Sequence, residues 1–368
     1  MKTAIVILNW NTKELLERFL PGVLGSAGAQ DEVIVADNAS TDGSVEMMKE
    51  KFPGVRLICL DKNYGFTGGY NRALEQVDGF DCFLLLNSDI EVKKGWLEPL
   101  SAFMEDNPDC GVCSPKLHAL QDKERFEYAG AAGGFIDRYG FPFCRGRVLK
   151  WTEPDKGQFD NLSRDVMWTT GASLMVRCSL WRELGGLDDR FFAHMEEIDF
   201  CWRAQLAGWR VCVVPESVIW HLGGGTLPVH SPFKLKLNYR NNLLLLQNNL
   251  AKTLAADYLR SGIGLDKAAA KGCRRAARRI FTRKLLDGAS GIIYLFTGRF
   301  KEFKAVLKAH SEARRLGRRP GREEVRAFLE TGRARPVSGI CNKCLPVQAL
   351  IRGKKTFFAI FAESDKNN

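Results

Sequence analysis

The chain has 368 residues, of which 45% are hydrophobic and 26% charged, and its formal net charge is +11. This composition is that of a folded soluble protein and excludes a disordered chain, and the length suffices for one large α/β domain with an appendage. The charge is uneven, because residues 251–368 hold 27 Lys and Arg against 10 Asp and Glu, which leaves a net charge of −6 on residues 1–250. An acidic body with a basic tail indicates two separate tasks.

Strand-like and helix-like stretches alternate through the first quarter of the chain. Short β-branched or apolar runs predict buried strands, and runs with helical spacing predict helices. The predicted strands are 3–8, 31–36, 55–60 and 82–86, and the predicted helices are 13–20, 45–52 and the segment entered through the glycine-rich turn 63–72. This alternation predicts a parallel sheet with right-handed crossovers, in which ligands bind beyond the carboxyl ends of the strands.

Polar clusters follow three of these predicted strands. They are Asn9-Trp10-Asn11, Asp37-Asn38 and Asn87-Ser88-Asp89. Because all three would lie along one rim of the sheet, the pattern favours a binding site there. The turn after the first strand has neither the Gly-x-Gly-x-x-Gly pattern nor a Walker lysine loop, so it does not hold a dinucleotide or a P-loop phosphate.

The next part of the chain is less regular. Residues 115–165 are glycine-rich and aromatic and predict an inserted hairpin region, and strands are predicted over 168–176, 209–214 and 217–220. After Leu235 the pattern turns helical and basic to the end.

The stretch from Gly185 to Thr226 contains three carboxylates, Glu196, Glu197 and Asp199, interleaved with aromatic and aliphatic residues. Apolar neighbours raise the pKa of a carboxylate, and a general base near neutrality needs a raised pKa. The alternative is an amphipathic helix with an acidic first turn, in which Asp199 pairs with Arg203 four residues on.

The sequence shows no sign of secretion or of a membrane span. The N-terminus leads directly into an apolar strand without a cleavage region. The longest apolar run near the C-terminus, from Leu285 to Phe296, is interrupted by an aspartate and two glycines and is shorter than the ~20 residues that cross a bilayer. Eleven scattered cysteines favour reduced thiols in a cytosolic protein, and the pairs Cys110/Cys113 and Cys341/Cys344 lie too far apart to indicate zinc.

Five motifs, in this order, resemble those of family 2 glycosyltransferases, the inverting GT-A enzymes that include many bacterial rhamnosyl- and galactosyltransferases of cell-surface polysaccharide synthesis. The motifs are Asp37-Asn38-x-Ser40-x-Asp42-Gly43-Ser44, Asn63-x-Gly65 through Asn71, Asn87-Ser88-Asp89, Glu196-Glu197-x-Asp199 and His221-x-Gly223-Gly224. The resemblance covers roughly residues 1–250. It implies an α/β GT-A fold with a mostly parallel central sheet flanked by helices, a donor half over about 1–115 and an acceptor half over about 116–250. A basic, amphipathic helical extension would then occupy 251–368.

The resemblance also implies a reaction and a set of roles. A sugar would move, with inversion, from a nucleotide-diphospho-sugar to a hydroxyl of a glycan or lipid-linked acceptor. Glu197 would be the general base, with Glu196 as the alternative, and Asp89 and His221 would hold Mn²⁺ or Mg²⁺. The implied nucleotide-binding residues are Asn9, Trp10, Asp37, Asn71, Asn87 and Ser88.

Several of these roles have structural alternatives. Asp37 could instead form an Asx turn, and Trp10 and His221 could belong to the core. Two positions also depart from the family pattern. Asn87 stands where the metal motif has its first Asp, and Glu197 stands where the second catalytic acid is usually Asp.

Two other functions compete with this interpretation. A nucleotidyltransferase that makes the sugar nucleotide would need a glycine-rich basic loop after the first strand, which is missing. A nucleic-acid binder would need aromatic residues interleaved with the basic tail, and the acidic body would repel a phosphate backbone, so we expect no nucleic acid.

The basic tail predicts a membrane partner. Residues 271–315 combine clustered Arg and Lys with apolar side chains, a composition typical of helices that lie in an anionic membrane interface. We therefore expect a cytoplasmic enzyme, peripheral on the inner face of the plasma membrane. The alternative is that the same helices fold back on the acidic body.

Overall fold

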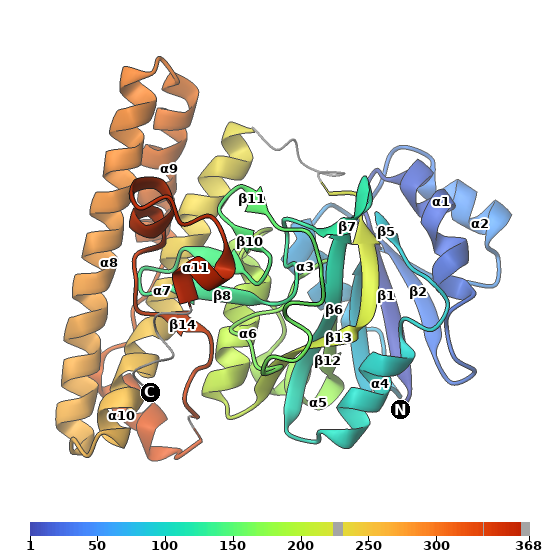
Figure 1. Cartoon of the computed structure of the whole chain (residues 1–368). Helices are drawn as coiled ribbons and strands as arrows, with labels where there is room; N and C mark the ends of the chain where they lie inside the picture. Colours follow the sequence, from blue (N-terminus) through green and yellow to red (C-terminus); the bar gives the residue numbers. More distant parts are fainter. Residues whose placement is uncertain (224–230, 334, 362–368) are drawn as a thin grey trace.

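A mixed, mostly parallel sheet forms the centre of the computed structural model, which describes residues 1–223, 231–333 and 335–361 (Figure 1). Its strand order is β3-β2-β1-β4-β12-β6-β13-β5, with β7 beside β6. The strands are β1 (Thr3–Asn9), β2 (Glu32–Asp37), β3 (Arg56–Cys59), β4 (Cys82–Asn87), β5 (Ile90–Glu91), β6 (Cys110–Ala119), β7 (Asp122–Phe126), β12 (Ser173–Arg177) and β13 (Arg210–His221). Strands β1 to β4 are mutually parallel, and β12 runs antiparallel to β4.

The predicted parallel strands are confirmed, and two details differ. Strand β12 begins at Ser173 instead of residue 168, because the Thr170 hydroxyl accepts the Ala172 N–H at 3.1 Å and turns the chain there. The two strands predicted over 209–220 are one strand, β13, with an irregular register between Val214 and Val218. Pro215 has no N–H to donate, so the ladder is interrupted without ending the strand.

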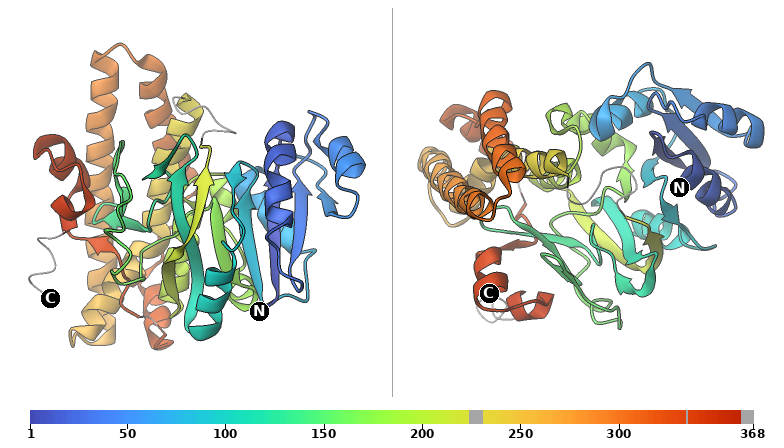
Figure 2. Two further views of the ribbon diagram at one scale, coloured as in Figure 1. Left: turned by 45° about the vertical axis from the view of Figure 1, so that its right-hand side comes forward. Right: turned by 90° about the horizontal axis from the view of Figure 1, so that it is seen from above.

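Helices cover both faces of the sheet, as Figure 2 shows. Alternate residues of β1 point to opposite faces, with Ala4 and Val6 in one hydrophobic cluster and Ile5 and Ile7 in the other. One face carries α1 (Lys13–Leu24), α2 (Ser44–Lys51) and α4 (Glu98–Asp106), and the other carries α3 (Gly65–Leu74), α5 (Cys178–Leu184) and α6 (Glu196–Leu206).

Part of the predicted inserted hairpin region, 115–165, forms a second sheet, whereas its first residues belong to β6 and β7 of the central sheet. Strands β8 (Gly134–Asp137), β9 (Pro142–Cys144), β10 (Arg147–Val148) and β11 (Trp151–Thr152) pair antiparallel in sequence order. Strand β14 (Ile340–Cys341), from near the C-terminus, adds to β8 in parallel. The C-terminal region therefore completes a sheet that belongs to the body.

Long helices form most of the C-terminal extension, as expected. They are α7 (Pro232–Arg260), α8 (Leu265–Phe296), α9 (Phe300–Leu316) and α10 (Arg322–Glu330), followed by a π-helical turn (Val347–Ile351) and α11 (Phe357–Phe361). Helix α7 runs across residue 250, where the sequence pattern placed the domain boundary. Within the described ranges, no helix is both long and apolar enough to cross a bilayer.

The inner side of the extension packs on the body. Leucines 243–246 of α7 lie in the same hydrophobic cluster as α3 and α6. Arg333 pairs with Glu183 at 2.9 Å and Arg335 with Asp109 at 3.2 Å. The basic tail thus folds back on the acidic body along this side, as one of the two alternatives for the tail expected.

Candidate active site

The ends of β1, β2 and β4 are joined by one network of polar side chains. Asn9 Nδ2 donates to Asp37 Oδ2 at 2.8 Å and to Ser40 Oγ at 3.1 Å. Thr12 Oγ1 donates to Asn9 Oδ1 at 2.6 Å and lies 2.8 Å from Ser88 Oγ. The structure therefore brings together Asn9, Asp37 and Ser88, as the strand-end pattern predicted. Asp37 also accepts the Ser40 N–H at 2.8 Å, so it shapes its own turn.

Trp10 lies beside this network and is 36% exposed, so it is not a core residue. The next residue, Asn11, has φ of 52° and accepts the Thr41 N–H at 2.7 Å, which fixes the turn after β1. An exposed indole at the rim leaves a ring face free for stacking.

The glycine-rich turn links the end of β2 to the loop that precedes α6. Asn38 Nδ2 donates to the Gly65 carbonyl at 2.9 Å, and its Oδ1 accepts the Tyr64 N–H at 3.0 Å. Gly65 has φ of +72°, and a Cβ there would lie 2.5 Å from the Phe192 ring. At the start of α3, the Phe66 N–H donates to the Phe192 carbonyl at 2.8 Å. Only glycine allows this close approach at position 65.

Asn71, expected to bind the nucleotide, does not join the strand-end network. Its Nδ2 donates to the Leu187 carbonyl and to Asp189 Oδ1, both at 2.8 Å, and its Oδ1 accepts the Leu187 N–H at 2.9 Å. Both ends of the amide are thus bonded to the segment before α6. In this structure Asn71 holds that segment against α3.

A buried histidine lies between two carboxylates at the end of β13. His221 Nε2 is 3.2 Å from Asp89 Oδ1, and His221 Nδ1 is 3.4 Å from Glu127 Oε2, without hydrogen-bond geometry on the second side. Burial alone would lower the pKa of His221, but the two carboxylates outweigh it and raise the pKa to about 10. Burial alone would raise the pKa of Asp89, but His221 outweighs it and lowers the pKa.

Asp89 and His221 fit a divalent cation as adjacent ligands. Two neighbouring ligands of an octahedral ion, each about 2.1 Å from it, lie about 3 Å apart, and the 3.2 Å between His221 Nε2 and Asp89 Oδ1 matches this. Glu127 faces the other ring nitrogen and would orient the ring rather than bind the ion. In the described part of the chain, no three His, Cys, Asp or Glu side chains converge as a complete cage.

The two glutamates that open α6 differ in environment. Glu196 is 4% exposed, and burial together with the charge of Glu197 raises its pKa well above the ordinary value. Burial raises the pKa of Glu197 to about 7. Neither Glu196 Oε2 nor Glu197 Oε2 has a hydrogen-bond partner among the described residues. The protonated form of Glu196 is therefore favoured, whereas Glu197 is close to its midpoint at neutral pH, which suits a general base.

The third acid of this stretch has a structural role. Asp199 is fully buried and pairs with Arg203 Nε at 2.7 Å, so the predicted pairing along the helix is confirmed. Its other oxygen, Oδ1, accepts from Asn248 at 2.9 Å and from Asn249 at 2.7 Å. Asp199 therefore anchors α6 to α7 and is not available for proton transfer.

The loop before α6 is strained and clamped from α7. Phe192, His194 and Met195 have φ of 63°, 70° and 73°, a conformation that is costly for residues with side chains. Asn241 Nδ2 lies 2.9, 2.8 and 2.6 Å from the carbonyl oxygens of Phe191, Ala193 and His194. These bonds hold the backbone that leads into Glu196 and Glu197.

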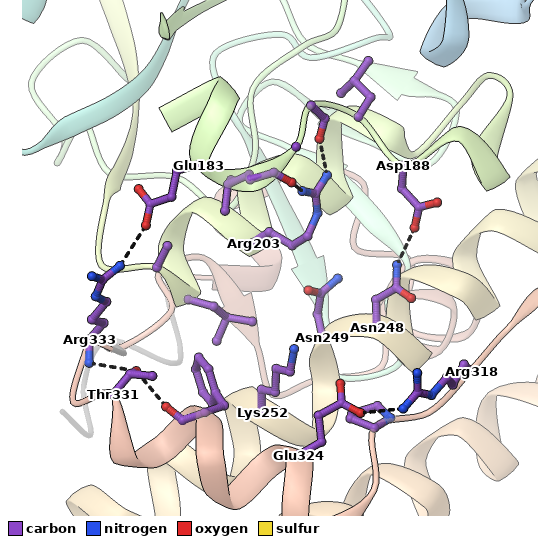
Figure 3. A pocket seen from close by; sticks show the side chains of 18 of the residues that line it. Glu183, Asp188, Arg203, Asn248, Asn249, Lys252, Arg318, Glu324, Thr331 and Arg333 are labelled. Atoms are coloured by element: carbon purple, nitrogen blue, oxygen red, sulfur yellow. Dashed lines mark hydrogen bonds and ion pairs between the residues drawn. The ribbon is translucent and has the colours of Figure 1, made fainter. Parts of the chain in front are cut away.

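A cavity of about 700 Å³ lies between α6, α7 and α10, away from the strand ends (Figure 3). Its polar side chains pair with one another, for example Arg318 with Glu324 at 3.3 Å and Asn248 with Asp188 at 3.2 Å. None of the predicted catalytic, nucleotide-binding or metal-binding residues lines it. The candidate site is therefore the open rim and not this cavity.

Comparison with known proteins agrees with the geometry. Residues 4–170 match the sequence model of Glycosyl transferase family 2. The chain is therefore a glycosyltransferase that carries a family 2 domain over these residues. The match ends before α6, so Glu196, Glu197, His221 and Asn241 lie in sequence beyond it.

The relatives of this family 2 glycosyltransferase include sugar transferases of bacteria. The N-acetylglucosaminyl-diphospho-decaprenol L-rhamnosyltransferase of Mycobacterium tuberculosis is 27% identical over 235 residues, which is 59% of this chain and 75% of that protein. The dTDP-rhamnosyl transferase RfbF of Shigella flexneri is 22% identical over 230 residues, which is 59% of this chain and 71% of that protein.

The fold is shared with a solved glycosyltransferase. A crystal structure of GalNAc-T7 with UDP, GalNAc and Mn²⁺ aligns with a TM-score of 0.52 at 16% identity, over 67% of this chain. The family 2 glycosyltransferase described here spans about half, 47%, of that chain. At this identity the likeness concerns the fold.

Sequence reasoning missed two residues of the site. Glu127 follows β7 and reaches His221 from 94 residues away in sequence, and no local pattern marks it. Asn241 belongs to the polar triplet Arg240-Asn241-Asn242 inside a leucine-rich helix. Polar residues that interrupt an apolar helix indicate buried hydrogen-bond partners, so the sequence could have pointed to this position. Gly224 to Thr226, the end of the late histidine stretch, lie outside the described residues.

Proposed function

We propose that the chain transfers a sugar, with inversion at the anomeric carbon, from a nucleotide-diphospho-sugar to a hydroxyl group of a glycan or lipid-linked acceptor. The observation that carries this proposal is the position of Glu197 relative to the strand ends. A Cβ at Gly171 would lie 3.6 Å from Glu197 Cβ, and the next residue, Ala172, accepts the Asn87 N–H at 2.9 Å. A base with a raised pKa and a free oxygen thus borders the rim that holds Asp89.

Glu197 performs the proton transfer in this proposal. Its free Oε2 accepts the proton of the acceptor hydroxyl as the hydroxyl oxygen attacks the anomeric carbon, and the diphosphate leaves from the opposite face. Burial and the charge of Glu197 raise the pKa of Glu196 beside it, which disfavours a second negative charge at the start of α6.

Asp89 and His221 would hold a divalent cation, Mn²⁺ or Mg²⁺, at the diphosphate end of the donor. When bound, the cation neutralises charge on the leaving diphosphate. Glu127 orients His221 for this task. Asn87 contributes no charge, so Asp89 provides the single carboxylate ligand.

Asn9, Asp37 and Ser88 position the nucleotide at the rim, and Trp10 stacks on the base. The network among the first three supports this role, because a rigid set of donors and acceptors binds a ribose or base without first being ordered. Asn71 acts indirectly in this proposal, by holding the loop before α6 against the glycine-rich turn.

The names of the relatives support a choice of donor and acceptor. One relative is named for dTDP-rhamnose transfer and another for rhamnose transfer to a sugar on a decaprenyl diphosphate. We therefore propose a role in polysaccharide biosynthesis of the cell envelope, with a deoxyhexose donor and a lipid-linked acceptor. All eleven cysteines are free thiols, which supports a reducing, cytoplasmic location, with the enzyme peripheral on the inner face of the plasma membrane.

A thermal-shift screen tests the donor. UDP-, dTDP- and GDP-sugars are compared with and without Mn²⁺, and we expect one nucleotide class to raise the unfolding temperature in a Mn²⁺-dependent way. The anomeric configuration of the product, read by proton NMR, then tests inversion. A nucleotidyltransferase would respond instead to a nucleoside triphosphate with a sugar phosphate, and a product of retained configuration would contradict the proposal.

A further inference from the structure

The turn between α8 and α9 exposes an unusual number of large apolar side chains. Phe296 is 85% exposed, Ile293 61% and Phe300 58%. Other exposed apolar residues on these helices are Phe281, Leu285, Ile292, Leu295 and Leu307. Contiguous exposed apolar surface of this kind marks an interaction site in a folded protein. We call residues 292–300 the hairpin tip.

Positive charge surrounds the hairpin tip. Arg299, Lys301, Lys304 and Lys308 are all exposed. The acids between residues 281 and 308 are neutralised, because Asp287 is buried against Arg283 at 2.7 Å and Glu302 pairs with Arg299 at 2.9 Å. Apolar side chains ringed by Lys and Arg complement an anionic lipid surface, whose headgroups attract the charges and whose acyl boundary accepts the rings.

The hairpin tip projects on the same side of the molecule as the strand ends. Both side views show α8 and α9 reaching beyond the sheet at the edge where β13 ends and α7 begins (Figures 1 and 2). Tyr239 Oη lies 2.6 Å from Ser290 Oγ, which fixes the outer part of α8 to α7. The next residues of α7, Arg240 and Asn241, hold the loop before α6, so the hairpin tip and the candidate base share one rigid support.

We propose that the hairpin tip inserts into the headgroup region of an anionic bilayer and directs the rim of the active site toward the membrane. This inference rests on the proposed function, because a lipid-linked acceptor presents its sugar at that surface. This mode of membrane binding differs from that of a helix that lies flat in the interface, since only the end of the hairpin would enter the lipid. Polar residues near the middle of α8, such as Arg274 and Arg278, would stay in water.

Vesicle flotation tests the proposal with the full chain, because truncation near residue 250 would cut α7. The probe is vesicles of phosphatidylglycerol and phosphatidylcholine in equal parts, with pure phosphatidylcholine as reference. We expect the unmodified chain to float with the anionic vesicles at low salt and to lose most of that binding at high salt. The double variant F296S/F300S should reduce the floating fraction at least about 10-fold, since both rings leave the interface.

Two matched controls test whether the hairpin tip, and not another surface, binds the vesicles. L350S/I351S removes two equally exposed apolar residues, 66% and 79% exposed, and should float as the unmodified chain does. K301Q/K304Q/K308Q removes three charges beside the hairpin tip and should reduce flotation, whereas K267Q/R274Q/R278Q removes three from the other half of α8 and should not. Each variant must keep the unmodified unfolding temperature.

The proposal is overturned if the unmodified chain does not float, if F296S/F300S floats equally well, or if the two charge variants lose binding equally. A dimer by light scattering that F296S/F300S dissociates, without flotation, would assign the hairpin tip to a second copy. Flotation needs neither donor nor acceptor, and the donor screen needs no membrane. Failure of this inference is therefore distinct from failure of the proposed function.

Discussion

Asn241 Nδ2 in α7 lies 2.6 Å from the carbonyl oxygen of His194, two residues before the first glutamate of the candidate base pair. The same nitrogen reaches the carbonyls of Phe191 and Ala193. One side chain from the helical extension thus supports most of the strained backbone that positions Glu197.

Asn241→Ala tests this support. The change removes the Asn241 donor from the part-buried carbonyls of Ala193 and His194, and we expect the free energy of unfolding to fall by about 1–3 kcal/mol. Turnover should fall by roughly 10-fold or more, because a loose loop misplaces Glu197. Urea unfolding and steady-state kinetics measure the two effects. Asn238→Ala, on the same helix, is the control and should change neither; an Asn241→Ala enzyme with full turnover would show that the loop holds itself.

Glu197→Gln tests the base. Turnover should fall by ~10²-fold or more while donor affinity is retained, because the amide cannot accept a proton. Glu196→Gln should be milder, since burial favours the protonated form of Glu196, which cannot accept a proton. In the unmodified enzyme, kcat/KM should rise with pH through about 7 and then level off, as Glu197 loses its proton. A Glu197→Gln enzyme that retains turnover would move the role to Glu196.

Glu196 should also make stability depend on pH. Its pKa is raised in the folded protein, so folding favours the protonated form, and that stability is lost as pH rises from the unfolded pKa toward the folded one. The loss is at most about 1.4 kcal/mol per pH unit. Glu196→Gln should therefore raise the unfolding temperature more at pH 8 than at pH 5. Glu75→Gln, at an exposed helix end, should show no such difference.

Substitutions at the proposed metal site should weaken Mn²⁺ binding to different degrees. Asp89→Ala and His221→Ala each remove a ligand and should abolish Mn²⁺-dependent binding of a nucleoside diphosphate in calorimetry. Glu127→Gln keeps both ligands but frees the far side of the His221 ring, and we expect Mn²⁺ affinity to fall by about 10–100-fold. Activity that survives complete chelation by EDTA would refute the metal assignment and point to Asn87 as the reason.

The strands could be predicted because the patterns that mark them lie within short stretches of sequence. Runs such as Thr3 to Leu8 are β-branched, bounded by polar residues and too short for helices, so β1 to β4 could be placed to within about two residues. The grouping of Asn9, Asp37 and Ser88 followed from the parallel order of those strands.

Long-range contacts could not be predicted in the same way. Glu127 meets His221, and Asn71 meets Leu187, across more than ninety residues of sequence. No periodicity encodes such partners, because they depend on how the second sheet and α3 pack. The same holds for β14, whose two residues become a strand only because β8 offers an open edge.

The contacts of Arg240 limit how parts of this enzyme can be exchanged with those of a relative. Its guanidinium donates to the Phe191 carbonyl at 2.7 Å and pairs with Glu312 of α9 at 3.2 Å, while Lys236 reaches the same carboxylate at 3.0 Å. The loop before α6 is thus linked through Arg240 to a helix more than a hundred residues downstream. A chimaera that exchanges the C-terminal third for that of a relative should keep Lys236, Arg240 and Glu312 as a set. Otherwise the exchange would leave a buried charge without its partner beside the loop before α6.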